Sequence, residues 1–90
     1  MTNGGIIAKM SQYVDYVETF KKLEALKNNY DLPDDYDGMV EACEFVIKCM
    51  CVMIEQYMRT KDKKWLKDWN NVYESKKNMV EYIADIEKAA

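Results

Sequence analysis

The sequence predicts an all-α protein, an antiparallel three-helix bundle that associates with itself. Ninety residues make one domain over 1–90, and a domain of this size buries only about 60% of the surface of its unfolded chain. Three Gly and one Pro leave few positions for the tight turns of a many-stranded sheet. Apolar residues recur at spacings of three and four over long stretches, which is typical of amphipathic helices. We therefore expect helices over about 5–28, 36–59 and 61–88.

The first helix carries two apolar stripes on neighbouring faces. One stripe, with spacings of four, three, four and three, consists of Ile6, Met10, Tyr13, Val17 and Phe20. The other consists of Tyr16, Leu23, Leu26 and Tyr30. The two halves of the helix should therefore contact different neighbours. The segment 28–35 should end it, because Asn and Asp favour turns and Pro33 disfavours helix in the residue before it.

The second helix should begin between Pro33 and Gly38, where Asp34, Asp35 or Asp37 can cap it. Acids at its start and bases beyond its end complement the helix dipole, which explains much of the uneven charge along the chain.

The third helix should be continuous, because its apolar phase survives the polar run 74–78. That phase is carried by Trp65, Trp69, Val72, Met79, Ile83 and Ile86. No Gly or Pro separates the second helix from the third, so one long helix through 59–64 remains an alternative to the turn that we expect there.

The second helix has more apolar perimeter than two neighbouring helices cover. Its charged residues occupy an arc of about 60°, and its apolar arc spans about 200° before Phe45 and Val52 are added. Two neighbours each cover about 100°. The surface formed by Phe45, Cys49 and Val52, here called the ridge, should therefore bind a second copy or a partner.

An acidic patch forms the second candidate site. The net charge is only −3, yet residues 31–44 contain six acids and no base. The patch comprises Asp34, Asp35, Tyr36, Asp37, Glu41 and Glu44. It should bind a protein partner with a basic surface, such as the nucleic-acid channel of an enzyme. Small, acidic, all-helical chains without catalytic groups are common among inhibitors encoded by phages and mobile elements. The comparison is with their general character, because no sequence motif supports it.

Metal, cofactor and enzyme chemistry are not expected. Residues 33–44 resemble a calcium-binding EF-hand loop over this span alone, but Pro33 stands where the first ligand is needed, so a helix start explains them better. The chain has no His, and its three cysteines lie on one helix, where they suit buried small hydrophobes better than zinc or disulfides. We find no Gly-rich phosphate loop and no nucleophile beside a base. The protein is therefore expected not to be an enzyme.

Two other functions remain open alternatives. The basic segment 59–67 contains Trp65 and is followed by Trp69, a mixture typical of surfaces that bind nucleic acid or a membrane. The spacing of the two Trp, however, places both on the helix face expected to point toward the core. Seven Tyr, two Trp and several Lys could also hold a nucleotide in a cleft between subunits.

A cytoplasmic location is expected, because no secretory signal precedes the first helix and the odd cysteine count suits a reducing compartment. Residues 39–58 contain four charges, too many for a membrane span.

Overall fold

The computed structural model describes residues 3–89, and every regular element within them is a helix. Residues 1, 2 and 90, the ends of the expected domain, lie outside the described residues. Helix α1 spans Asn3–Ala25 and continues into the 3₁₀ turn η1, Leu26–Asn28. Helix α2 spans Tyr36–Thr60. The third helical segment consists of η2 (Lys63–Leu66), α3 (Trp69–Glu74) and α4 (Lys76–Ala89).

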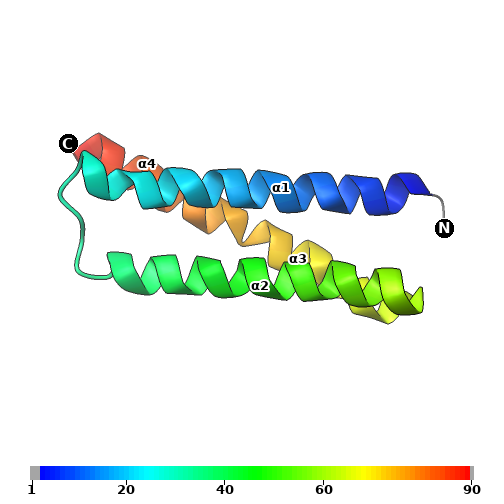
Figure 1. The fold of residues 1–90 in the computed structure, drawn as a ribbon. Coiled ribbons are helices and arrows are strands. Elements are labelled where there is room, and N and C mark those ends of the chain that lie inside the picture. Colours follow the sequence, from blue (N-terminus) through cyan, green and yellow to red (C-terminus); the bar gives the residue numbers. More distant parts are fainter. Residues whose placement is uncertain (1–2, 90) are drawn as a thin grey trace.

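The helices form a rod with principal extents of 46 × 21 × 19 Å. Figure 1 shows α1 and α2 side by side, joined at one end by the loop after η1, with α3 and α4 crossing behind them. The C-terminus lies at the end of the rod that carries this loop, and the N-terminus lies at the other end. The face of α1 and α2 that is turned away from the third segment therefore carries no other helix of the described chain.

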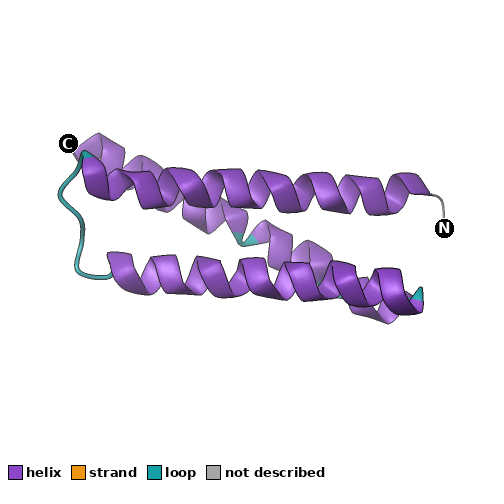
Figure 2. Cartoon of the chain, in the orientation of Figure 1, coloured by secondary structure: helices purple, strands orange, loops and turns teal. Residues whose placement is uncertain are grey.

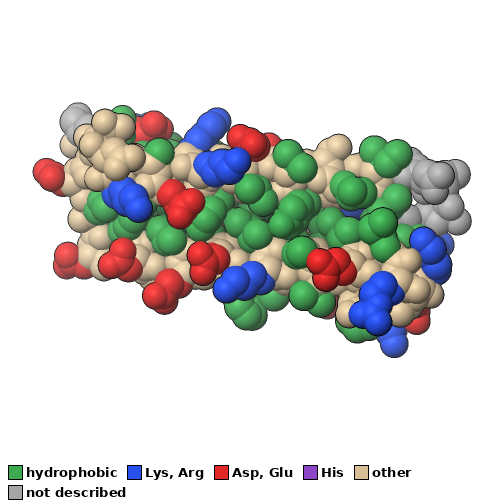
Figure 3. Space-filling view, in the orientation of Figure 1, with side chains coloured by type: hydrophobic (Ala, Val, Ile, Leu, Met, Phe, Trp, Pro, Cys, Tyr) green, Lys and Arg blue, Asp and Glu red, His purple; other side chains and the backbone are tan. Residues whose placement is uncertain are grey.

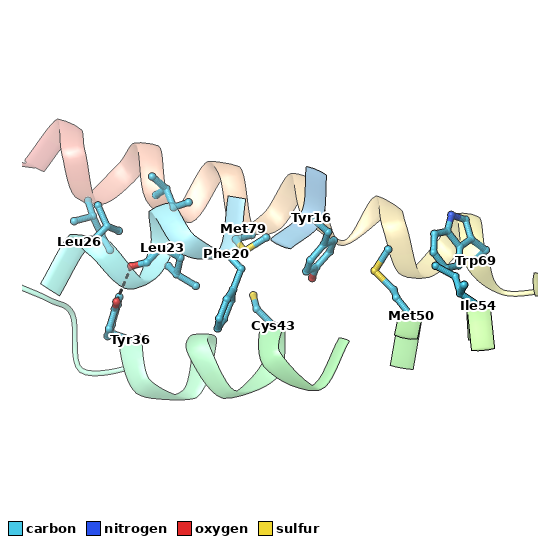
Figure 4. Packing of buried hydrophobic residues seen from close by; sticks show 12 residues of the cluster. Tyr16, Phe20, Leu23, Leu26, Tyr36, Cys43, Met50, Ile54, Trp69 and Met79 are labelled. Atoms are coloured by element: carbon cyan, nitrogen blue, oxygen red, sulfur yellow. Dashed lines mark hydrogen bonds between the residues drawn. The ribbon is translucent and has the colours of Figure 1, made fainter. Parts of the chain in front are cut away.

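The core lies along the axis of the rod and draws on all three helical segments (Figure 4). Its fully buried side chains include Tyr16 and Leu23 from α1, Met50 from α2, and Trp69 and Met79 from the third segment. Of the two stripes predicted on the first helix, the stripe beginning at Tyr16 supplies most of the residues that this helix contributes to the core, joined by Phe20. In the stripe beginning at Ile6, Met10 is exposed, and Ile6, Tyr13 and Val17 are partly buried.

The loop after η1 is held by the first residue of α2. The Tyr36 hydroxyl donates a hydrogen bond of 2.6 Å to the carbonyl oxygen of Leu23, drawn as the dashed line in Figure 4, and lies 3.3 Å from that of Glu24. The last carbonyls of a helix have no partner within the helix, so Tyr36 satisfies groups that α1 leaves open. Burial raises the pKa of Tyr36, which keeps this donor protonated.

The N-terminus of α2 differs from the expected side-chain cap. Asp35 occupies the cap position but makes no side-chain bond to the helix backbone. Its carboxylate instead accepts a hydrogen bond of 2.7 Å from the Tyr82 hydroxyl of α4. Burial, followed by this bond, raises the pKa of Tyr82 to about 12. A contact between helices thus replaces a local one.

The turn expected near residue 61 is present. Lys61 adopts a left-handed conformation (φ 58°, ψ 20°), and its backbone N–H donates to the Tyr57 carbonyl at 2.7 Å, which ends α2. The Asp62 carboxylate then accepts from the backbone N–H of Lys64 at 2.9 Å and starts η2. Side-chain bonds of this kind stand in for the absent Gly or Pro.

The prediction of one continuous third helix is wrong. The segment starts as a 3₁₀ turn and is interrupted again at Ser75, between α3 and α4 (Figure 2). The Ser75 hydroxyl donates to the Val72 carbonyl at 2.6 Å and lies 3.1 Å from the Tyr16 hydroxyl of α1. Serine competes with the helix for backbone carbonyls, which accounts for the break although the apolar phase continues across it.

A polar layer joins α1 to the third segment around this break. Gln12 accepts a hydrogen bond of 2.7 Å from the indole N–H of Trp69. Asp15 accepts one of 2.8 Å from Tyr73 and forms an ion pair with Lys76. These partners fix the rotation of the third segment about its axis, because a turned segment would leave them unpaired.

Candidate interaction surface

The ridge on α2 is not covered by the rest of the chain. Phe45 is 66% exposed and Val52 is 50% exposed, while Cys49 is partly buried. On the helix these residues lie opposite the buried side chains Cys43 and Met50, which face the core. Exposed aromatic and β-branched side chains on a small rod are candidates for contact with another molecule.

A hollow of about 460 Å³ lies beside the ridge, between α2 and the start of the third segment. Its lining joins the ridge to Met53 and Trp65. The Lys64 ammonium lies 5.5 Å from the centroid of the Trp65 ring, and within the described residues the Trp65 Nε1 atom is buried without a hydrogen-bond partner. The hollow is wide enough to receive an apolar side chain from outside.

Charged side chains of α2 border the ridge on its other side. Lys48 and Glu44 lie 3.7 Å apart and are both exposed. One turn past the ridge, Glu55 accepts a hydrogen bond of 3.4 Å from the Cys51 thiol. That bond, ahead of burial, raises the pKa of Cys51 and favours its protonated form. The ridge is thus an apolar strip with a rim of both charge signs.

The acidic patch lies at the end of the rod where α2 begins. Its carboxylates are all exposed: Asp34, Asp35, Asp37, Glu41 and Glu44. The inclusion of Tyr36 in this surface is wrong, because Tyr36 is only 5% exposed and its hydroxyl is bonded to α1. Sequence reasoning placed it among its neighbours, but a helix of this pitch turns it inward toward the core.

A third exposed surface, on the N-terminal half of α1, was not predicted as a site. It consists of Ile7, Met10 and Val14, of which Ile7 is 58% and Val14 is 55% exposed. The spacing of three and then four between these residues is the signal that could have predicted it. Met10 instead belongs to the stripe predicted to begin at Ile6. Figure 3 shows a further apolar band along the junction of α1 and α2, on the face without a third helix.

Trp65, within the basic segment 59–67, and Trp69, just after it, are not both exposed to solvent. The Lys and Arg side chains of this segment are exposed. Trp69, however, is fully buried and bonded to Gln12, and Trp65 is partly buried. Stacking of nucleic-acid bases on the two Trp is therefore not available in this conformation.

An open groove of about 710 Å³ runs between α1 and α4. Lys22, Tyr30 and Lys76 are among the residues along it. Lys76 is paired with Asp15, and the hydrogen bond that Lys76 donates to Asp15 raises the pKa of the Lys76 ammonium. One of the cations in the groove is thus already neutralised.

No family model matches the chain, and neither the curated proteins nor the solved structures contain a significant match. Among the described helices, none has a stretch long and apolar enough to cross a membrane. Over the same residues, no three acidic, Cys or His side chains are grouped as metal ligands would be. The three cysteines are free thiols.

Proposed function

We propose that this chain is a non-catalytic helical interaction protein, an antiparallel three-helix bundle that acts by stoichiometric binding to a protein partner in the cytoplasm. The observation that supports this most is the exposure of large apolar side chains on both long helices, Phe45 and Val52 on α2 and Ile7 and Val14 on α1. Fully burying one such side chain contributes about 1.5–3 kcal/mol, whereas association costs at least about 4 kcal/mol. Several of them must therefore be covered together.

The finer proposal concerns the acidic patch. Exposed carboxylates at one end of the rod, with no base between residues 31 and 44, suit a partner with a basic groove. A nucleic-acid-handling enzyme has such a groove, and blocking it would make this chain an inhibitor of the phage or mobile-element type. Binding of this kind needs no catalytic group on the chain.

The test is affinity capture from the native host with the triple variant Asp34→Lys, Asp37→Lys and Glu41→Lys. Asp35 is left unchanged because it accepts the bond from Tyr82. We expect a protein that the wild-type chain captures in equimolar amount to be lost from the variant, whose far-ultraviolet circular dichroism stays helical.

The matched control reverses three exposed acids of the third segment, Glu74→Lys, Glu81→Lys and Asp85→Lys. It has the same net charge as the patch variant and should keep the partner. If both variants retain it, or both lose it, the patch does not carry the binding.

A small-ligand function is the second candidate, favoured by the groove between α1 and α4 with Lys22 and Tyr30 along it. A nucleotide held there would raise the melting temperature when a nucleotide panel is added. Loss of that shift in both Lys22→Ala and Tyr30→Ala would assign it to the groove, and absence of any shift would leave the protein-partner proposal alone.

A further inference from the structure

We infer that the ridge of α2 is covered by a second copy of this chain, in an antiparallel α2–α2 pair about a two-fold axis. The inference rests on the proposed function, because it takes the ridge as a binding surface. It adds which molecule covers the ridge and how the two α2 helices are aligned. It is carried by the order of the charges beside the ridge, which an antiparallel copy of the same helix complements and a parallel copy does not.

The ridge and the polar Gln56 beyond it together have the spacing of a helix-pairing seam. Phe45, Cys49, Val52 and Gln56 follow one another at alternating spacings of four and three, which keeps them in one line along α2. The first and third are exposed, and the other two are partly buried. This line points away from the core of its own chain.

The charges that border this seam alternate in sign along the helix: Glu44, Lys48, Glu55 and Arg59. All four side chains are exposed. Glu44 and Arg59 are equally distant from the bond between Cys51 and Val52, and so are Lys48 and Glu55. Reversing the direction of the helix about this centre therefore places a negative charge at the position of each positive one, and a positive charge at the position of each negative one.

An antiparallel second copy uses this order. Centred on the same bond, it sets Glu44 opposite the second copy's Arg59 and Lys48 opposite its Glu55, and the two-fold axis repeats each pair. A parallel copy would set each charge against itself. Within one chain, Lys48 lies 3.7 Å from Glu44, an exposed pair that contributes little by itself. Residues 48 and 55 of one chain are two helical turns apart, about 10 Å, so they do not contact each other.

The surroundings of the seam agree with this register. It places Cys49 near the second copy's Val52, next to the hollow lined by Met53 and Trp65, which can receive that side chain. It also brings the acidic end of one rod, residues 31–44, over the basic end of the other, residues 59–67. The exposed stripe on α1 has no comparable self-complementary order of charges at its borders.

Charge exchange at residues 48 and 55 tests the pairing. We compare the wild type with Lys48→Glu, with Glu55→Lys and with the double exchange by sedimentation equilibrium. Each single change turns two attractive pairs into two repulsive ones, so it should weaken dimerisation about tenfold or more. The double exchange should restore the wild-type dissociation constant, and so should an equimolar mixture of the two single variants.

Rescue by mixing is the decisive result, because it requires contact between residue 48 of one chain and residue 55 of another. Glu81→Lys, an exposed reversal on α4, serves as a control that should dimerise as the wild type does. Helicity of every variant is checked by circular dichroism.

Three outcomes would overturn the inference: a wild-type chain that stays monomeric at the highest concentration reached, dimers that ignore both single changes, or single variants that mixing does not rescue. None of these outcomes affects capture of a basic partner by Asp34, Asp37 and Glu41. Conversely, failure of that capture would leave the dimer measurements unchanged, so the two proposals fail separately.

Discussion

A single carboxylate, Asp15, connects α1 to both α-helices of the third helical segment. It accepts the hydroxyl of Tyr73 from α3 and the ammonium of Lys76 from α4. The hydrogen bond from Lys76, followed by that from Tyr73, lowers the pKa of Asp15 below its ordinary value of 3.8. A carboxylate whose pKa falls on folding stabilises the folded state above that ordinary value, and the contribution disappears as the pH drops through the lowered pKa.

Asp15→Asn should therefore flatten the acid side of the stability profile. The amide can still accept from Tyr73 but carries no charge for Lys76. We expect a loss of about 1 kcal/mol or less at neutral pH, because the pair is partly exposed and screened. The difference between the melting temperatures of wild type and variant should shrink as the pH falls from about 6 to about 2.

The control for this measurement is Glu81→Gln, which removes an exposed carboxylate elsewhere on α4. Its melting temperature should follow that of the wild type at every pH. A gap between wild type and Asp15→Asn that stays constant down to low pH would show that the charge of Asp15 does not contribute.

At the scale of the elements, the junction after α2 holds a residue of an unfavoured type. Lys61 has φ 58°, in the left-handed region that costs residues with a Cβ about 1–2 kcal/mol and costs Gly almost nothing. Helices commonly end on a Gly in this conformation. The junction keeps Lys61 there because the backbone bond to Tyr57 and the Asp62 carboxylate fix the chain on either side.

Lys61→Gly should accordingly stabilise the protein by about 0.5–1 kcal/mol, the relief of strain minus the greater freedom of Gly in the unfolded chain. Ala42→Gly, at an exposed position inside α2, should destabilise it by about 1 kcal/mol. Urea denaturation of the two variants measures the opposite signs. Destabilisation by both would mean that Lys61 is not strained.

The helices were predictable from the sequence to the extent that local spacing decides them. The third segment shows where this ends: Trp69, Met79 and Ile83 are buried as their phase predicts. The helix nevertheless breaks at Ser75, whose hydroxyl bonds to the Val72 carbonyl, and apolar spacing alone does not predict that break. The exposed ridge followed from counting how much perimeter two neighbours cover. The burial of Tyr36 could not be predicted in this way, because its hydroxyl donates a hydrogen bond to a carbonyl at the end of another helix.

For the whole molecule, the proposed association would link stability to concentration. A rod of 46 × 21 × 19 Å has a thin core, and large apolar side chains of both long helices remain in contact with water. A second copy that binds only the folded chain draws the folding equilibrium toward the native state by mass action. The stability of this protein should then depend on its concentration.

The melting temperature should rise with wild-type concentration, by a few degrees for each 1 kcal/mol of added stability. Phe45→Ser combined with Val52→Ser should abolish the rise without loss of helicity. Ile7→Ser combined with Val14→Ser, which changes the exposed stripe of α1, should preserve it. A concentration dependence that survives the first variant and is lost in the second would move the association to α1.

The position of the acidic loop at one tip of the rod has a consequence for valency. An antiparallel pair of rods carries one acidic end at each extremity, where it lies beside the basic end, residues 59–67, of the other copy. Such a dimer would bind two target molecules at once, or two sites on one filament. It would dissociate from a target with many sites far more slowly than a single chain would.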